Sequence, residues 1–306
     1  MKKVISLILS VVCLLSLCSC ALSSHNDTLV MGVRDTADTL NPYLADSVTE
    51  KIIYTNCFEG LMLMDSEGNP DLAGATTYSV SGDGLTYTFR LNPDARWHIT
   101  KAHTEKAEKS GLKKIPTQID AEDYVFGIGL FLLENPEELS CIKGASKFRK
   151  SLSYKDLGVK ATDTLTLTIT LNKKKDDFLF SLATLPLLPC NEEFYNALGK
   201  GYGKNPESTL MNGPYTVTEL TETDNVILRR NPDYKGKTQV INKNITLHFT
   251  GTEDKLQERL LNGDYHLYFA ENKENPAEPV LKLREDVTGI YSYKDTIYFH
   301  NGEISR

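Results

Sequence analysis

The chain has 306 residues, of which 40% are hydrophobic and 25% charged, with 20 Gly and 12 Pro. This length predicts about two domains, and the composition excludes a disordered, collagen-like or disulfide-dense chain. The formal net charge is −7 and the pI is about 5.5. Because binding to nucleic-acid phosphates needs a positive surface, this charge balance disfavours a nucleic-acid partner.

The N-terminus has the features of an export signal. Lys2 and Lys3 precede an uncharged run, Val4 to Leu17, which is too short to span a bilayer, since a spanning helix takes about 20 residues. The run ends in Leu17-Cys18-Ser19-Cys20, which resembles the lipobox of bacterial lipoproteins. An ordinary secretory signal with incidental cysteines is the alternative interpretation. Both interpretations predict an exported protein.

The lipobox resemblance implies that Cys20 carries the lipid and becomes the new N-terminus. Residues 1–19 would then be a lipoprotein signal peptide and residues 20–27 a tether. The implied location is the outer face of the bacterial cytoplasmic membrane, or the periplasm, with the membrane contacted through the N-terminal lipid.

Three cysteines are left once the signal and the lipid site are set aside: Cys57, Cys141 and Cys190. An odd number cannot pair completely, and their spacing has no metal-ligand pattern. We therefore predict buried thiols that act as small apolar side chains and no metal site, and we make no prediction of a disulfide.

The first elements alternate between strand and helix. Thr28 to Arg34 is a β-rich run that enters a loop at Asn41-Pro42. Val48 to Phe58 has helical periodicity, with Ser47 or Thr49 as the N-cap.

A strand-rich part follows. Thr76 to Val80 and Leu85 to Leu91 flank the turn cluster Ser81-Gly82-Asp83-Gly84, which predicts a hairpin. Residues 101–114 are highly charged, which predicts a surface insertion outside the core. Asp120 precedes an apolar run, Ala121 to Leu133, that predicts a capped and largely buried helix.

The second half of the chain predicts further strands and one crossover. Thr164 to Leu171 alternates strictly between threonine and aliphatic residues, which is typical of a half-buried strand. A strand, helix, strand order later in the chain indicates a crossover unit over a sheet. The later elements are strands at Tyr215–Leu220, Asn225–Arg229, Ile245–Phe249 and Tyr265–Phe269, and helices at Glu192–Leu198 and Glu253–Leu261.

The motifs of common enzymes are missing from the sequence. No serine has the Gly-x-Ser-x-Gly context of a hydrolase, and Ser146 comes nearest. His98 and His103 are five residues apart, which does not fit a zincin helix. The Gly-rich run 199–204 lacks the P-loop spacing. The sequence therefore predicts no catalytic residue, no bound metal and no cofactor.

Several blocks with distinctive residues occur along the chain. They are Leu40-Asn41-Pro42, Phe58-Glu59-Gly60-Leu61, Asp83–Leu91 with Ala95-Arg96-Trp97, Asp120–Phe126, Asn212-Gly213-Pro214-Tyr215, Arg230–Tyr234 and Leu261–Asp264. In this order, the blocks resemble the extracytoplasmic solute-binding proteins of peptide and oligopeptide ABC transporters, known as family 5. The segment around Asp83–Leu91 is the most specific of them.

The resemblance implies an α/β, periplasmic-binding-protein-like fold of type II, cluster C, with two lobes. The first lobe and an inserted subdomain would be present and the second lobe mostly missing, so that the chain is truncated at its C-terminus. The implied divisions are 28–60 and 191–272 for lobe I, 61–190 for the inserted subdomain, and 273–306 for the start of lobe II. Open sheet edges would then make the chain prone to association.

Members of this family hold an extended peptide between the lobes, mainly through main-chain hydrogen bonds. The implied partners are a peptide ligand and the permease subunits of an ABC importer. The implied ligand-binding residues are Asp35, Thr36, Ala37, Asp38, Asn212, Gly213, Tyr215 and, in the last segment, Tyr298. A turn at Asn212-Gly213, a core Tyr215, and solvated Asp35 and Asp38 are the structural alternatives.

Two other functions stay open from the sequence. A truncated, non-transport lipoprotein that acts as an interaction or sensing module would share the export signal and the acidic surface. An exported hydrolase is the weaker alternative, because no nucleophile or metal set is recognisable.

Overall fold

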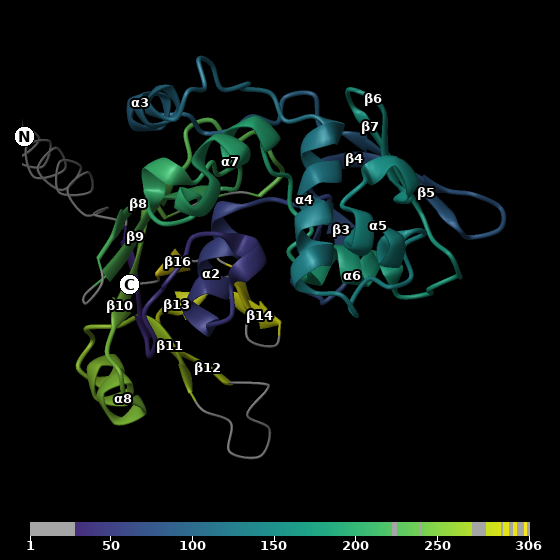
Figure 1. Ribbon diagram of the computed structural model, residues 1–306. Coiled ribbons are helices and arrows are strands. Elements are labelled where there is room, and N and C mark those ends of the chain that lie inside the picture. Colours follow the sequence, from purple (N-terminus) through teal and green to yellow (C-terminus); the bar gives the residue numbers. More distant parts are fainter. Residues whose placement is uncertain are drawn as a thin grey trace, which may run out of the picture.

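The computed structural model (Figure 1) describes the chain from residue 28 onward, with short gaps. The described residues are 28–221, 225–238, 240, 242–270, 280–288, 290–293, 296–298 and 303–304. Cys20 and the predicted signal peptide lie outside this range.

A six-stranded sheet forms the larger of the sheets, with the order β12-β11-β1-β10-β9-β8. The central strand β1 is parallel to β10 and β11, and the remaining pairs are antiparallel. The strands are β1 (Thr28–Val33), β8 (Tyr215–Leu220), β9 (Asn225–Arg230), β10 (Asn244–Phe249), β11 (Leu267–Ala270) and β12 (Val280–Leu283).

Two helices cover opposite faces of this sheet. Helix α2 (Val48–Cys57) packs on the face that carries Leu29 and Met31 of β1. Helix α8 (Glu253–Leu261) packs on the other face, where Leu256 joins Tyr265 and Val30. A Cβ on Gly32 of β1 would overlap Leu256 and Tyr265, so α8 can approach β1 this closely only because residue 32 has no side chain.

The predicted crossover is confirmed. The chain leaves β10, passes through α8 and returns as β11 on the far side of β1, parallel to it. The predicted strand pair at 215–229 is also confirmed as β8 and β9.

A second, four-stranded sheet has the order β4-β5-β7-β6. Its strands are β4 (Ala75–Val80), β5 (Thr86–Leu91), β6 (Val159–Asp163) and β7 (Thr166–Thr170), and β2 (Met62–Met64) pairs with β3 (Pro70–Leu72) nearby. The predicted hairpin is thus β4–β5. The predicted strand at 164–171 is β7, whose Leu167 and Ile169 are fully buried.

Helices α4 (Ala121–Glu134), α5 (Ala145–Ser151) and α6 (Phe178–Thr184) lie around the smaller sheet (Figure 1). Helix α7 (Glu192–Leu198) lies apart from this sheet, on the side of α3. Asp120 is the N-cap of α4, as the sequence predicts, and its carboxylate accepts the N–H of Glu122 and Asp123.

The last strands are β13 (Val287–Thr288) with β16 (Glu303–Ile304) and β14 (Tyr291–Tyr293) with β15 (Thr296–Tyr298).

The hydrophobic side chains form two main clusters. One cluster gathers β2, the four-stranded sheet and α4 to α7; the other gathers the six-stranded sheet and α2. Phe194, Tyr202 and Leu210 belong to the first cluster.

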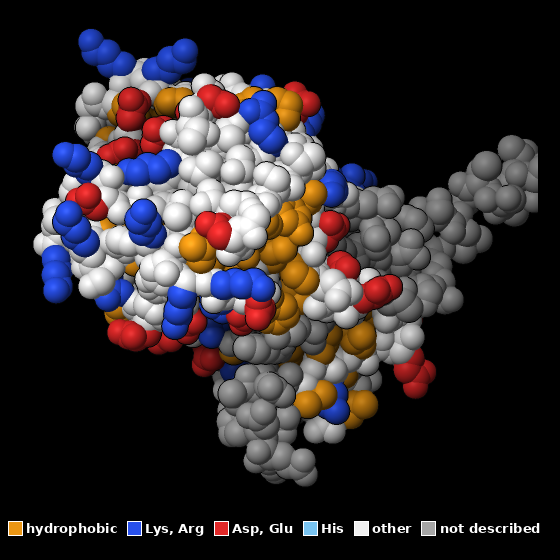
Figure 2. Space-filling view, turned by 90° about the vertical axis from the view of Figure 1, so that its right-hand side faces the viewer, with side chains coloured by type: hydrophobic (Ala, Val, Ile, Leu, Met, Phe, Trp, Pro, Cys, Tyr) orange, Lys and Arg blue, Asp and Glu red, His pale blue; other side chains and the backbone are white. Residues whose placement is uncertain are grey.

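Figure 2 looks onto the side that carries α5 and α6, where hydrophobic side chains gather in a band and Lys and Arg side chains spread over the surface to one side of it. The residue boundaries predicted for the lobes stay a prediction.

The charged segment 101–114 is not the surface insertion that its composition predicts. It contains helix α3 (Lys101–Lys109), which is N-capped by Thr100. Two side chains of this helix, His103 and Ala107, are buried and lie one turn apart. The packed side of this helix is narrow, so the many exposed Lys and Glu residues mask it in the composition.

The thiols of Cys57, Cys141 and Cys190 are free and buried, in agreement with the sequence. Burial raises the pKa of all three thiols, and those of Cys57 and Cys190 well above the ordinary value. Within the described residues, no helix combines the length and the apolar character needed to cross a bilayer.

Candidate functional site

The carboxyl ends of β1 and β10 form a natural ligand position. These parallel neighbours continue into helices on opposite faces of the sheet, so the loops that follow them diverge. Open α/β sheets bind ligands at such a switch point. At this end of the sheet the charged groups of Arg34, which follows β1, and Glu253, the first residue of α8, are 4.0 Å apart.

The loop after β1 is held by one buried carboxylate. Glu50 is 6% exposed, and its Oε1 accepts the N–H of Asp38 at 2.9 Å and of Thr39 at 3.0 Å. Its Oε2 accepts the N–H of Asp46 at 2.9 Å and of Ser47 at 3.1 Å. One side chain therefore fixes both ends of the 38–47 loop and caps α2 at the same time.

This arrangement leaves part of the loop free for a ligand. Thr49 donates its hydroxyl to the carbonyl of Asp35 at 2.8 Å. Within the described part of the chain, the main-chain groups of Thr36 and Ala37 have no hydrogen-bond partner. The side chains of Asp35, Thr36 and Asp38 are exposed, and Ala37 is half-buried against the core. The four residues predicted for this loop therefore share one exposed and anchored segment.

Asn212 and Gly213 lie elsewhere, at the C-terminal end of α2. The Asn212 amide accepts the N–H of Glu59 at 3.1 Å and donates to the Glu59 carbonyl at 2.9 Å. Gly213 donates its N–H to Cys57, and a Cβ on it would come within 2.5 Å of the backbone there. Since α2 has ten residues and so is about 15 Å long, these two residues are well separated from the Asp35 loop.

Tyr215 is a core residue. It is 1% exposed, and its hydroxyl donates to the carbonyl of Asn242 at 3.1 Å, before β10 begins. Burial raises the pKa of this phenol well above the ordinary value. Asn212, Gly213 and Tyr215 thus have the packing contacts of the structural alternatives, and their contact with a ligand stays a prediction.

Tyr298 is the last residue of β15 and pairs with Tyr291 of β14. The β15 strand lies beside α2, the helix that also carries Glu50. The last predicted site residue is thus placed near the same helix by its backbone.

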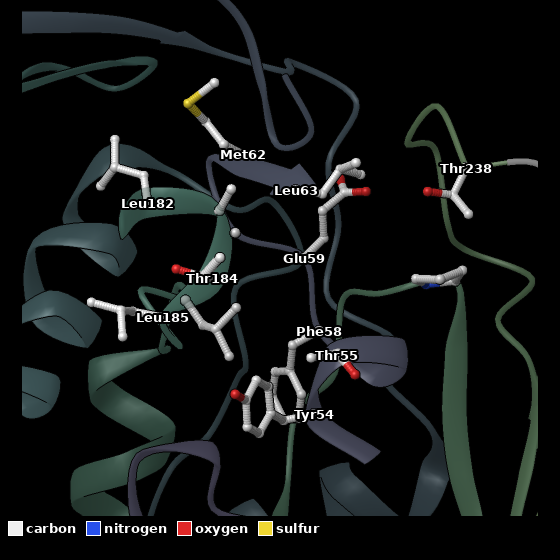
Figure 3. Close-up of a pocket in the computed structure, with 14 residues that line it drawn as sticks. Tyr54, Thr55, Phe58, Glu59, Met62, Leu63, Leu182, Thr184, Leu185 and Thr238 are labelled. Atoms are coloured by element: carbon white, nitrogen blue, oxygen red, sulfur yellow. The ribbon is translucent and has the colours of Figure 1, made fainter. Parts of the chain in front are cut away.

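A small pocket that sequence reasoning missed lies at the C-terminal end of α2 (Figure 3). Its cavity volume is ≈ 50 Å³, which suits a few water molecules and is too small for a side chain such as Leu. Tyr54 and Phe58 lie at one end in Figure 3, and Leu182 and Leu185 lie across from Glu59. The block Phe58-Glu59-Gly60-Leu61 could have drawn attention to it.

Glu59 is the one carboxyl group among the residues that line this pocket. Burial raises its pKa from 4.5 to about 7, although a hydrogen bond from the Tyr234 hydroxyl and the charge of Lys237 act in the other direction. The Tyr234 hydroxyl in turn accepts the N–H of Thr238 at 3.2 Å. The Glu59 carboxyl group thus lies in a pocket lined by residues of both hydrophobic clusters.

The described residues contain no group of three or more His, Cys, Asp or Glu side chains that could hold a metal ion. His98 lies 2.7 Å from Asp233, and the ring of His103 is occupied by Thr100, Pro206 and Thr209. The two histidines thus serve separate structural contacts.

Comparisons with known proteins agree with this architecture. The family profile described as "Bacterial extracellular solute-binding proteins, family 5 Middle" matches residues 67–301. Among curated proteins, oligopeptide-binding protein AliA of Streptococcus pneumoniae is 31% identical, over 71% of this chain and 32% of its own length. Oligopeptide-binding protein AmiA of the same species is 29% identical, over 92% of this chain and 42% of its own length.

Solved structures show the same fold. The substrate-binding domain of an oligopeptide ABC transporter from Bacillus anthracis superposes with a TM-score of 0.68 and 24% identity, over 87% of this chain and 49% of that one. OppA of Listeria monocytogenes bound to peptide gives a TM-score of 0.68 at 22% identity, over 81% and 47% of the two chains. The fold is therefore the α/β, two-lobed, type II binding-protein fold, represented in part.

The chain spans between about a third and a half of the length of the relatives that it matches. The family profile covers most of the chain, and its range includes the smaller sheet, Glu59's partner Tyr234 and β8 to β12. The chain belongs to family 5 of the bacterial extracellular solute-binding proteins.

Proposed function

We propose that this chain is part of the solute-binding component of an ABC importer and that it holds an extended peptide at the loop Asp35–Asp38. The observation that carries the proposal is the anchored loop whose Thr36 and Ala37 main-chain groups have no partner in the described chain. A peptide in extended form can supply the missing donors and acceptors, as in strand addition.

The similar proteins support the choice of a peptide. AliA and AmiA are named oligopeptide-binding proteins, and the Listeria OppA structure holds a peptide. Delivery to permease subunits, by closure of two lobes around the ligand, is the corresponding transport step.

The proposal includes a lipid anchor at Cys20, on the strength of the Leu17-Cys18-Ser19-Cys20 motif. We expect Cys20→Ala to move the protein from the membrane fraction to the soluble fraction of the cells. Cys18→Ala is the matched control and should leave the protein in the membrane fraction. Equal behaviour of the two variants would exclude Cys20 as the lipid site.

Peptide binding is tested by calorimetric titration of the chain with trialanine, trilysine and an equimolar mixture of the free amino acids. Because the loop offers main-chain groups, the two peptides should bind with affinities within about tenfold of each other, and the free amino acids should not bind.

Two loop variants sharpen this test. Ala37→Pro removes a main-chain N–H and should weaken peptide binding, whereas Thr36→Ala alters only an exposed side chain and should not. A folded chain that binds neither peptide would leave the interaction or sensing module as the better function.

A further inference from the structure

A second and larger cavity lies along the outer side of β8, at the edge of the six-stranded sheet. Its volume is ≈ 520 Å³, which falls in the range of small-molecule sites. Three elements line it: the start of α3, the 3₁₀ turn η4 (Pro206–Ser208), and β8. None of the lining residues belongs to the Asp35 loop or to the pocket at Glu59.

The walls of this groove are fixed by His103. The main-chain N–H of Thr100 donates to His103 Nδ1 at 3.0 Å, so the ring proton is on Nε2. Nε2 lies 2.9 Å from the Pro206 carbonyl and 3.2 Å from the Thr209 carbonyl, and donates to them. Burial lowers the pKa of His103, which keeps the ring neutral. The ring therefore joins α3 to η4 and holds the groove open beside β8.

The polar lining of the groove is rich in acceptors. The Oδ1 atom of Asn205 is buried and has no hydrogen-bond partner. Glu207 and Glu219 contribute carboxylates, and none of the lining residues is a Lys or Arg. His98, which also lines the groove, is engaged with Asp233 at 2.7 Å. With two carboxylates and no cationic side chain, the lining favours a ligand that carries positive charge.

The apolar lining completes the description of the ligand. Ala102, Met211 and Val217 supply aliphatic surface between the polar groups. We propose that the groove between α3 and β8 binds a compact organic cation, with an ammonium or guanidinium group on an aliphatic stem. The cationic group pairs with Glu207 and Glu219, while the stem lies on the apolar surface. The site is separate from the proposed peptide site and does not depend on it.

The probe for this site is agmatine, which has a guanidinium and an ammonium group on a four-carbon stem. Calorimetric titration of the full chain should give saturable, one-to-one binding. 4-Guanidinobutanoate keeps the guanidinium group but carries a carboxylate at the other end, and it should bind at least about tenfold more weakly because of Glu207 and Glu219.

Variants locate the binding. Glu207→Gln and Glu219→Gln should each weaken agmatine binding by about tenfold. Glu108→Gln, on the exposed side of α3, is the matched control and should bind like the unmodified chain.

Three results would overturn the proposal. They are no saturable binding at millimolar agmatine; equal affinity in all three variants; and displacement of agmatine by trialanine, which would place agmatine at the peptide site. Failure of the peptide titration alone leaves the agmatine result unaffected, because the two sites share no residue.

Discussion

The Glu50 carboxylate reaches the backbone of Asp38, twelve residues before it, and accepts its N–H at 2.9 Å. The same carboxylate accepts three further backbone N–H groups, two of them at the entry of α2. The geometry of the candidate peptide loop is thus set by the first turn of the helix that follows it.

Glu50→Ala should destabilise the protein strongly, because it leaves four backbone N–H groups without their acceptor. We expect a loss of about 3 kcal/mol in the free energy of unfolding and a smaller loss for Glu50→Gln, which keeps one carbonyl oxygen. Urea unfolding measures both. Glu108→Ala, at an exposed helical position, is the control and should change stability little. A Glu50→Ala variant as stable as this control would contradict the anchoring role.

Asn212→Ala should cost about 2 kcal/mol through the two lost hydrogen bonds to Glu59. Asn212→Asp should cost more at neutral pH, since a carboxylate cannot donate to the Glu59 carbonyl and is buried as a charge. Chemical unfolding at pH 5 and pH 8 checks this, and the Asp variant should recover at the lower pH. If Asn212 served only a ligand, all three proteins would unfold alike.

Glu59 should make the stability fall as the pH rises. Its pKa is about 7 in the folded protein against 4.5 ordinarily, so the folded state keeps a proton that the unfolded chain has released. The free energy of unfolding therefore decreases from about pH 4.5 to about pH 7, by about 3 kcal/mol in all. Glu59→Gln should remove this decrease in thermal melts across that range.

Asp123 adds to the same trend, since burial raises its pKa from 3.8 to about 8. Glu59→Gln with Asp123→Asn should therefore give the flattest stability profile between pH 4 and 8. Exposed Glu138→Gln is the control and should follow the unmodified chain. An unchanged slope in the double variant would show that neither group holds its proton in the folded state.

Gly32→Ala should destabilise the sheet by about 2 kcal/mol, because its Cβ overlaps Leu256 and Tyr265. Combining it with Leu256→Ala should cost less than the sum of the two single changes, since the second change makes room for the first. Gly82→Ala, where nothing lies within 4 Å, is the matched control. If the free-energy costs of the two single changes simply add in the double variant, the Cβ of residue 32 does not overlap Leu256.

Local features of the fold were predictable from the sequence. The β4–β5 hairpin follows from its turn, where Asp83 accepts the N–H of Leu85 and the Ser81 hydroxyl. Both partners lie within two residues of Asp83, so the sequence pattern contains the whole interaction. Helix α4 was predictable for the same reason, since its capping residue precedes it directly.

The candidate site was predictable only in part. The loop Asp35–Asp38 follows a strand and could be inferred, but the role of Asn212 depends on Glu59, 153 residues earlier in the chain. The packing of α3 depends on contacts between His103 and the carbonyls of Pro206 and Thr209, which composition does not encode. The spacing of His103 and Ala107 was the local signal for a buried helical side.

The most direct test of the peptide site is hydrogen exchange at the loop, measured by mass spectrometry with and without saturating trialanine. The amides of Asp38 and Thr39 are already bonded to Glu50 and should exchange slowly in both states. If the loop binds the peptide main chain, the amides of Thr36 and Ala37 exchange fast alone and slowly with the peptide. Unchanged exchange at Thr36 and Ala37, under conditions where calorimetry shows bound peptide, would contradict the proposed site.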